Sequence, residues 1–138
     1  MADFVAGGGD IPDFSAFDID GNGTFNTPVS LSNFFTSNPS SSTPVSGTIV
    51  RLVDINGDQD IKTASGLQTA LATGGEYVNI DMAIDSTAIF ITSATNGSDA
   101  DYIFFATSDG NGAITVALVG QTAVNSDIDS YLTTGFGI

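Results

Sequence analysis

Two short loops in this sequence carry oxygen-bearing side chains at alternate positions. One loop begins at Asp18 and the other at Asp54, and both follow the pattern D-x-[DN]-x-[DN]. This spacing brings side-chain oxygens around one cavity, and calcium takes six to eight such hard ligands at about 2.3–2.6 Å. The loops therefore predict calcium sites. The candidate ligands are Asp18, Asp20, Asn22, Thr24, Asp54, Asn56, Asp58 and Asp60.

Both loops depart from the EF-hand pattern, which places a bidentate glutamate at position 12. Those positions hold Val29 and Ser65 in this chain. The second loop resembles the loop of dockerin repeats, including the predicted helix after it, but has Gln59 in place of the glycine at position 6. We expect another aspartate, a backbone carbonyl or water to supply the missing ligand, at some loss of affinity. Plain turns rich in Asp and Asn are the alternative interpretation.

The charge of the chain limits its partners. Its 138 residues include 16 acids against Arg51 and Lys62, a formal net charge of −14. Such a charge repels nucleic acid and anionic membranes, so we expect neither as a partner. Apolar runs such as the one at 103–106 are also far too short to span a bilayer. High salt or divalent cations must offset the self-repulsion, and the aspartate loops favour cations.

Residues that usually perform acid–base or nucleophilic chemistry are scarce. The chain has no His and no Cys, and it has a single glutamate, lysine and arginine. Acid–base catalysis near neutral pH usually draws on His or on a carboxylate tuned by a partner. The aspartate pairs at 99 and 101 and at 127 and 129 leave an aspartate-only hydrolase open. We expect the chain not to be an enzyme.

Residues 45–138 predict a mainly β domain, which we expect to be an antiparallel, sandwich-like fold. Strand-like runs lie at 45–54, 77–82, 87–94, 102–107 and 114–120. The turn at 108–112 predicts a hairpin between the last two, without any need for metal. One short helix is predicted over 65–73, because Leu67, Ala70 and Leu71 have helical spacing and Gly74 follows. A further turn of helix is predicted over 127–132.

Residues 1–44 predict an extended N-terminal arm. The segment is rich in Gly, Ser, Pro and Asp, and Gly7-Gly8-Gly9 and the run at 38–44 indicate extended chain or turns. It nevertheless contains six of the ten phenylalanines: Phe4, Phe14, Phe17, Phe25, Phe34 and Phe35. A flexible linker does not carry so much aromatic surface. We expect the arm to lie against its own core or a neighbouring subunit.

Several short segments between residues 74 and 138 support a family resemblance. They read GGEY at 74–77, AIFIT at 88–92, DYIFF at 101–105, SDGNGAI at 108–114 and LVG at 118–120. In this order they resemble the C-terminal region of calcium-binding proteins secreted by the bacterial type I pathway, the RTX-associated group. The tail at 127–138 is similar to their uncleaved export signal, and the N-terminus as given shows no cleavable signal. The resemblance implies export and calcium-dependent folding outside the cell. The glycine-rich nonapeptide repeats of that group are absent, so a standard calcium β-roll is not expected.

These observations predict a non-enzymatic structural protein that is extracellular or lies at the cell surface. We expect a calcium-stabilised subunit of a self-assembling filament, surface layer or matrix. Its arm over residues 1–44 would bind a neighbouring copy and so form a homo-oligomer or polymer. The alternative is a secreted calcium-dependent adhesin or carbohydrate-binding module, which exposed aromatic side chains near an aspartate loop, such as Tyr77 or Tyr131, would favour.

Overall fold

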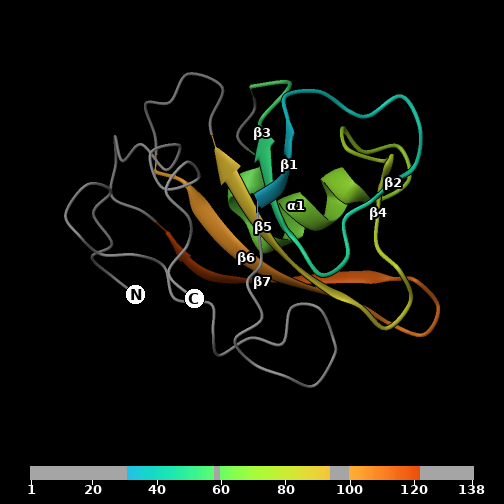
Figure 1. Ribbon diagram of the computed structural model, residues 1–138. Coiled ribbons are helices and arrows are strands. Elements are labelled where there is room, and N and C mark those ends of the chain that lie inside the picture. Colours follow the sequence, from blue (N-terminus) through green and yellow to red (C-terminus); the bar gives the residue numbers. More distant parts are fainter. Residues whose placement is uncertain (1–30, 58–59, 94–99, 122–138) are drawn as a thin grey trace.

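A five-stranded sheet and one α-helix dominate the computed structural model, which describes residues 31–57, 60–93 and 100–121 (Figure 1). The strand order in the sheet is β1-β3-β5-β6-β7. The strands are β1 (Leu31–Phe35), β3 (Ile49–Val53), β5 (Thr87–Ser93), β6 (Tyr102–Ser108) and β7 (Ile114–Gln121). The expectation of a mainly β fold with one short helix is confirmed.

The large sheet is mixed. Strands β5, β6 and β7 pair in the expected antiparallel manner, whereas β1, β3 and β5 pair in parallel. A tight turn reverses the chain directly, but parallel neighbours need a long connection that returns to the same end of the sheet. Between β3 and β5 that connection contains the 3₁₀ helix η1 (Asp60–Lys62) and α1 (Ala64–Leu71). In the described ranges a helix, and not a second large sheet, therefore covers one face of the sheet.

Helix α1 begins and ends close to the predicted limits of 65–73. Its N-cap is Thr63, whose side-chain oxygen accepts a hydrogen bond from the Gly66 N–H at 3.0 Å. The chain leaves the helix at Ala72 and turns at Gly74, where φ is +86°. No helix in these ranges is long and apolar enough to cross a membrane.

The main hydrophobic core lies between α1 and one face of the sheet. Leu67, Ala70 and Leu71 of the helix contribute to it. The sheet contributes alternate residues of its strands: Val50, Leu52, Ala88, Phe90, Phe104, Ala106 and Val116. Burying each large apolar side chain contributes about 1.5–3 kcal/mol, so this layer fixes the helix on the sheet.

The last part of the predicted arm, residues 31–44, pairs with its own chain. Strand β1 forms an edge of the large sheet beside β3, and β2 (Thr43–Pro44) pairs in parallel with β4 (Ile80–Asp81). Neither strand was predicted from the sequence. Residues 1–30 of the arm lie outside the described residues, and so does the helical turn predicted over 127–132.

Candidate metal centre

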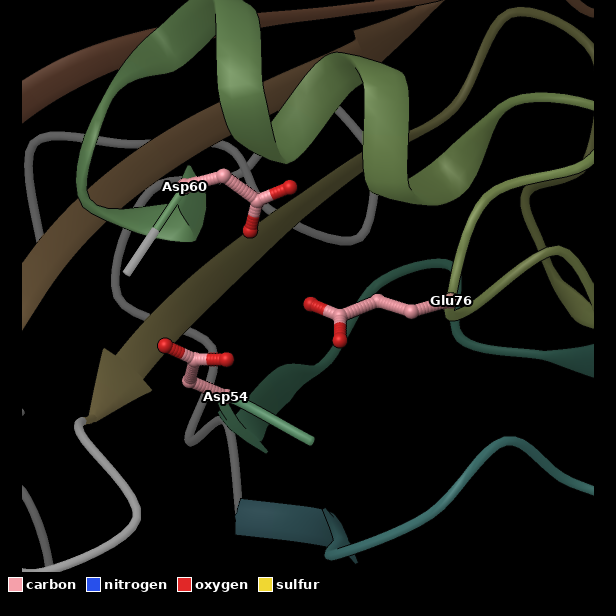
Figure 2. Close-up of side chains that lie close together, drawn as sticks. All are labelled: Asp54, Asp60 and Glu76. Carbon is pink, nitrogen blue, oxygen red and sulfur yellow. The ribbon is translucent and has the colours of Figure 1, made fainter. Parts of the chain in front are cut away.

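Three carboxylate side chains from separate segments point toward one another beside the end of β3 (Figure 2). Asp54 directly follows β3, Asp60 begins η1, and Glu76 lies in the turns after α1. One carboxylate oxygen of each lies within 4.8 Å of the other two. Two oxygens on opposite sides of a calcium ion lie about 4.6–5.2 Å apart, because each ligand is about 2.3–2.6 Å from the ion. The three oxygens are therefore close enough to share one calcium ion.

The position of Asp54 is fixed by hydrogen bonds on both sides. Its N–H donates to the carbonyl oxygen of Ser93 at 3.0 Å, which ties it to the end of β5. Its side-chain Oδ1 accepts a hydrogen bond from the Gly57 N–H at 2.7 Å. This short turn folds the loop back on itself, with Gly57 at φ +76°. Asp54 is only 1% exposed, so it contributes a buried ligand oxygen.

Asp60 is held by the start of α1. Its carbonyl oxygen accepts hydrogen bonds from the N–H and the Oγ1 of Thr63, each at 3.3 Å. Gly66 packs so closely on the same carbonyl that a β-carbon there would lie 1.8 Å from the oxygen. The helix start and the candidate metal centre are therefore one packed unit.

Glu76 reaches the same space from the opposite end of the helix. Its Oε2 accepts a hydrogen bond from the Ile55 N–H at 3.3 Å. Its Oε1 is buried and has no hydrogen-bond partner among the described residues. Burial raises the pKa of this carboxyl, and the negative charges of Asp60 and Asp54 raise it further. Hydrogen bonds from the backbone N–H groups of Ile55 and Asn56 lower the pKa and so offset part of this rise.

Tyr77, the neighbour of Glu76, connects the centre to the sheet. Its side chain is completely buried, and its hydroxyl contacts the carbonyl oxygens of Val53 and Phe35. The same hydroxyl accepts a hydrogen bond from the Val53 N–H at 3.2 Å. Burial raises the pKa of Tyr77 well above its usual value, so the hydroxyl stays neutral. The segment that positions Glu76 therefore also joins β3 to the edge strand β1.

The structure brings together two of the predicted ligands, Asp54 and Asp60. Asn56 lies exposed in the loop between them, and its backbone N–H donates to the Glu76 carboxyl. The predicted ligands outside the described residues are Asp18, Asp20, Asn22, Thr24 and Asp58. Glu76 was missed, because it lies beyond the loop and beyond α1. Its one sequence signal is that it is the single glutamate of the chain.

Asp109, in the turn between β6 and β7, has a structural role. Its Oδ1 accepts hydrogen bonds from the N–H groups of Asn111 at 2.8 Å and Ala113 at 2.9 Å. Hydrogen bonds from the backbone of Ala113 and Asn111 lower the pKa of this carboxyl. Backbone N–H groups of the same turn therefore provide the hydrogen bonds of the Asp109 carboxylate. This agrees with the hairpin interpretation of 108–112.

The three-carboxylate centre offers only hard oxygen ligands. Carboxylates and carbonyls suit calcium, magnesium and manganese, whereas zinc and copper usually recruit His or Cys, and this chain has neither. Three carboxylates leave room for backbone carbonyls and water in a calcium shell of six to eight ligands. No protein-family model, no curated protein and no solved structure matches the chain.

Proposed function

We propose that this chain is a non-enzymatic extracellular structural protein whose fold is stabilised by calcium bound between Asp54, Asp60 and Glu76. One observation carries the proposal. Carboxylate oxygens from three segments lie within 4.8 Å of one another, and the buried Oε1 of Glu76 has no hydrogen-bond partner among the described residues. A cation would give that oxygen a partner and would neutralise the repulsion among three like charges.

Calcium at this position would stabilise the fold because its ligands belong to different elements. Asp54 directly follows β3, Asp60 precedes α1, and Glu76 follows α1. A bound ion would therefore close both ends of the helical crossover onto the sheet. A ligand that binds only the folded state at a hundred times its dissociation constant adds about 2.7 kcal/mol of stability.

Calcium is favoured over magnesium because the three carboxylates come from separate segments of the chain. Magnesium demands near-ideal octahedral geometry at about 2.0–2.1 Å and gives up its water reluctantly. Calcium accepts irregular shells, including backbone carbonyls of a loop such as the one at 54–57. Extracellular calcium modules work with dissociation constants of about 10⁻⁴–10⁻³ M, which suits a site with an incomplete loop pattern.

The extracellular location and the assembly are the wider part of the proposal. The resemblance of residues 74–138 to RTX-associated proteins supports export by the type I pathway. Assembly into a filament, surface layer or matrix would use the Phe-rich arm. Since residues 31–44 pair with their own chain, residues 1–30 are the part of the arm that would bind another copy.

The alternative of a carbohydrate-binding module receives less support. Such sites use exposed aromatic side chains beside the calcium loop. Tyr77 is the aromatic residue next to Glu76, but it is 0% exposed and its hydroxyl contacts the backbone of β1 and β3. Tyr131 lies outside the described residues.

Calorimetric titration with calcium chloride tests the metal-binding part of the proposal. We expect one binding event at this centre in the wild-type chain and its loss in Asp54→Asn, which keeps the size of the side chain and removes its charge. Asp85→Asn is the matched control, because Asp85 is exposed and lies outside the three-carboxylate group. Equal calcium binding by all three proteins would contradict the proposal.

Size measurement by light scattering, with calcium and then with chelator, tests the assembly part. We expect polymers of the native chain in calcium at high protein concentration. A stable monomer in both conditions would contradict self-assembly and leave the metal-binding part to be decided by the titration.

A further inference from the structure

The centre of the sheet face that points away from α1 is also apolar, although Arg51 lies on the same face in register with Ile91. Residues paired across neighbouring strands lie on the same face, and one row across this face is Ile49, Ile89, Phe105 and Ala117. The next row contains Arg51, Ile91 and Ile103. We call the side chains of Ile49, Ile89, Ile91, Ile103 and Phe105 the far-face cluster.

The four isoleucines of the far-face cluster are as well buried as the main core. Ile49 is 1% exposed, and Ile89, Ile91 and Ile103 are each 0% exposed. None of them belongs to the core beneath α1. Helix α1 and the Ile61 side chain of η1 are part of that core, so neither helix of the described ranges covers the far-face cluster.

We propose that the far-face cluster is the binding surface for residues 1–30 of this chain. The segment joins the sheet at the right place, because Leu31 at the start of β1 is in register with Ile49. Extended chain reaches about 3.3 Å per residue, whereas five strands at about 4.8 Å spacing are only about 19 Å wide. Residues 1–30 can therefore cross the whole sheet and return.

The composition of residues 1–30 matches an apolar surface. The segment carries four phenylalanines, Phe4, Phe14, Phe17 and Phe25, whereas residues 122–138 carry only Phe136. Fully burying one such ring contributes about 1.5–3 kcal/mol, which offsets the entropy lost when the Gly-rich segment is ordered.

This inference deepens the proposed function by naming the surface that an arm binds, and only its consequence for assembly rests on that function. A segment that binds the far-face cluster of its own chain can bind the same surface on a neighbour. Such an exchange creates no new kind of contact, and it turns a monomer into an open chain of subunits. The docking within one chain is independent of calcium and of export.

Nuclear Overhauser contacts in the full-length chain test the docking. Isoleucine methyl groups and phenylalanine rings are labelled in the same protein, and the rings at 4, 14, 17 and 25 are assigned by single Phe→Leu substitutions. We expect contacts from these rings to the methyl groups of Ile89, Ile91 or Ile103. The methyl groups of Ile61 and Ile80, which lie in the core beneath α1, serve as the internal control.

Two results would overturn the docking proposal: no contact from any ring of residues 1–30, or, from rings outside the sheet, contacts to this face only from Phe136. A second sample mixes chains labelled only at isoleucine with chains labelled only at phenylalanine. Contacts in that mixture would support exchange between neighbours. Contacts seen only in the doubly labelled chain would support docking within one chain and contradict assembly through the arm. Failure of the docking and failure of the assembly are therefore distinguishable.

Discussion

The hydroxyl of Tyr77 lies 3.1 Å from the carbonyl oxygen of Phe35, the last residue of β1, although the two residues are 42 positions apart. Tyr77 also contacts the N–H and carbonyl groups of Val53, which directly precedes Asp54. One side chain thus joins the edge strand β1, the strand β3 and the segment that positions Glu76. The candidate metal centre is therefore coupled to the part of the sheet that β1 completes.

Replacing Tyr77 with Phe should destabilise the fold by about 1–3 kcal/mol, because it removes the hydrogen-bond partner of part-buried backbone groups of Val53 and Phe35. Urea unfolding measures the loss. Tyr102→Phe, in a half-buried tyrosine of β6, removes the same atom and should cost clearly less. Equal losses in the two variants would show that the Tyr77 hydroxyl does not hold β1 in place.

Replacing Glu76 with Gln should change stability in opposite directions with and without calcium. Burial and the charge of Asp60 raise the pKa of Glu76. A group with a raised pKa stabilises the fold at low pH, and this contribution is lost as the pH rises through the pKa of the folded state. In chelator near pH 7 the substitution should therefore stabilise the fold by roughly 0.5–1 kcal/mol, the size of a partly exposed charge interaction.

In excess calcium the same variant should be less stable than wild type, because it has lost a charged ligand. Thermal unfolding at pH 7 measures both arms. Asp85→Asn removes one charge elsewhere and should show no such reversal of sign. A change of the same sign in calcium and in chelator would place Glu76 outside the metal centre.

Replacing Gly66 with Ala should destabilise the fold despite the better helix propensity of alanine. The new β-carbon would lie 1.8 Å from the carbonyl oxygen of Asp60, so the start of α1 or the loop must shift. Overpacking of this kind costs about 1–3 kcal/mol, more than the roughly 1 kcal/mol that Ala gains over Gly in a helix. Calcium affinity should fall as well, since Asp60 moves.

Gln68→Ala, at an exposed position of the same helix, is the control for Gly66→Ala, and it should leave urea unfolding almost unchanged. A Gly66→Ala protein that is as stable as wild type and binds calcium equally well would contradict the close packing of Gly66 on Asp60.

Replacing Asp109 with Ala should lower the melting temperature above about pH 5 and have little effect at low pH. Hydrogen bonds from Ala113 and Asn111 lower the pKa of this carboxyl. A lowered pKa stabilises the fold at pH values above the unfolded-state pKa, and this contribution is lost as the pH falls through the folded-state pKa. The melting temperatures of the two proteins should converge in acid. A constant difference at every pH would show that the carboxylate charge is not responsible.

The strands β5, β6 and β7 could be predicted because their signals are local. The turn at 108–112 and the β-branched runs on either side fix them within one or two residues of the observed ends. The helix after Thr63 was equally accessible, since its N-cap and apolar spacing are local as well. The parallel pairing of β3 with β5 could not be read from a hairpin signal, because it depends on where the helical crossover returns.

Strands β1 and β2 and the residue Glu76 were missed because they depend on contacts between distant residues. Strand β1 has the sequence LSNFF, and it forms because β3 offers a free edge and Tyr77 contacts its last carbonyl. Glu76 joins the candidate metal centre only because α1 folds back over the sheet. Asp54 and Asp60 could be predicted from loop spacing, whereas Glu76 required the tertiary structure.

Thermal unfolding of the wild-type chain in calcium and in chelator tests calcium stabilisation of the fold most directly. For a dissociation constant of about 10⁻⁴–10⁻³ M, a hundredfold excess needs about 10–100 mM calcium. Linkage then adds about 2.7 kcal/mol, which for a domain of this size raises the melting temperature by roughly 10 °C. We expect a rise of this order with calcium. An identical melting temperature in calcium and in chelator would contradict it.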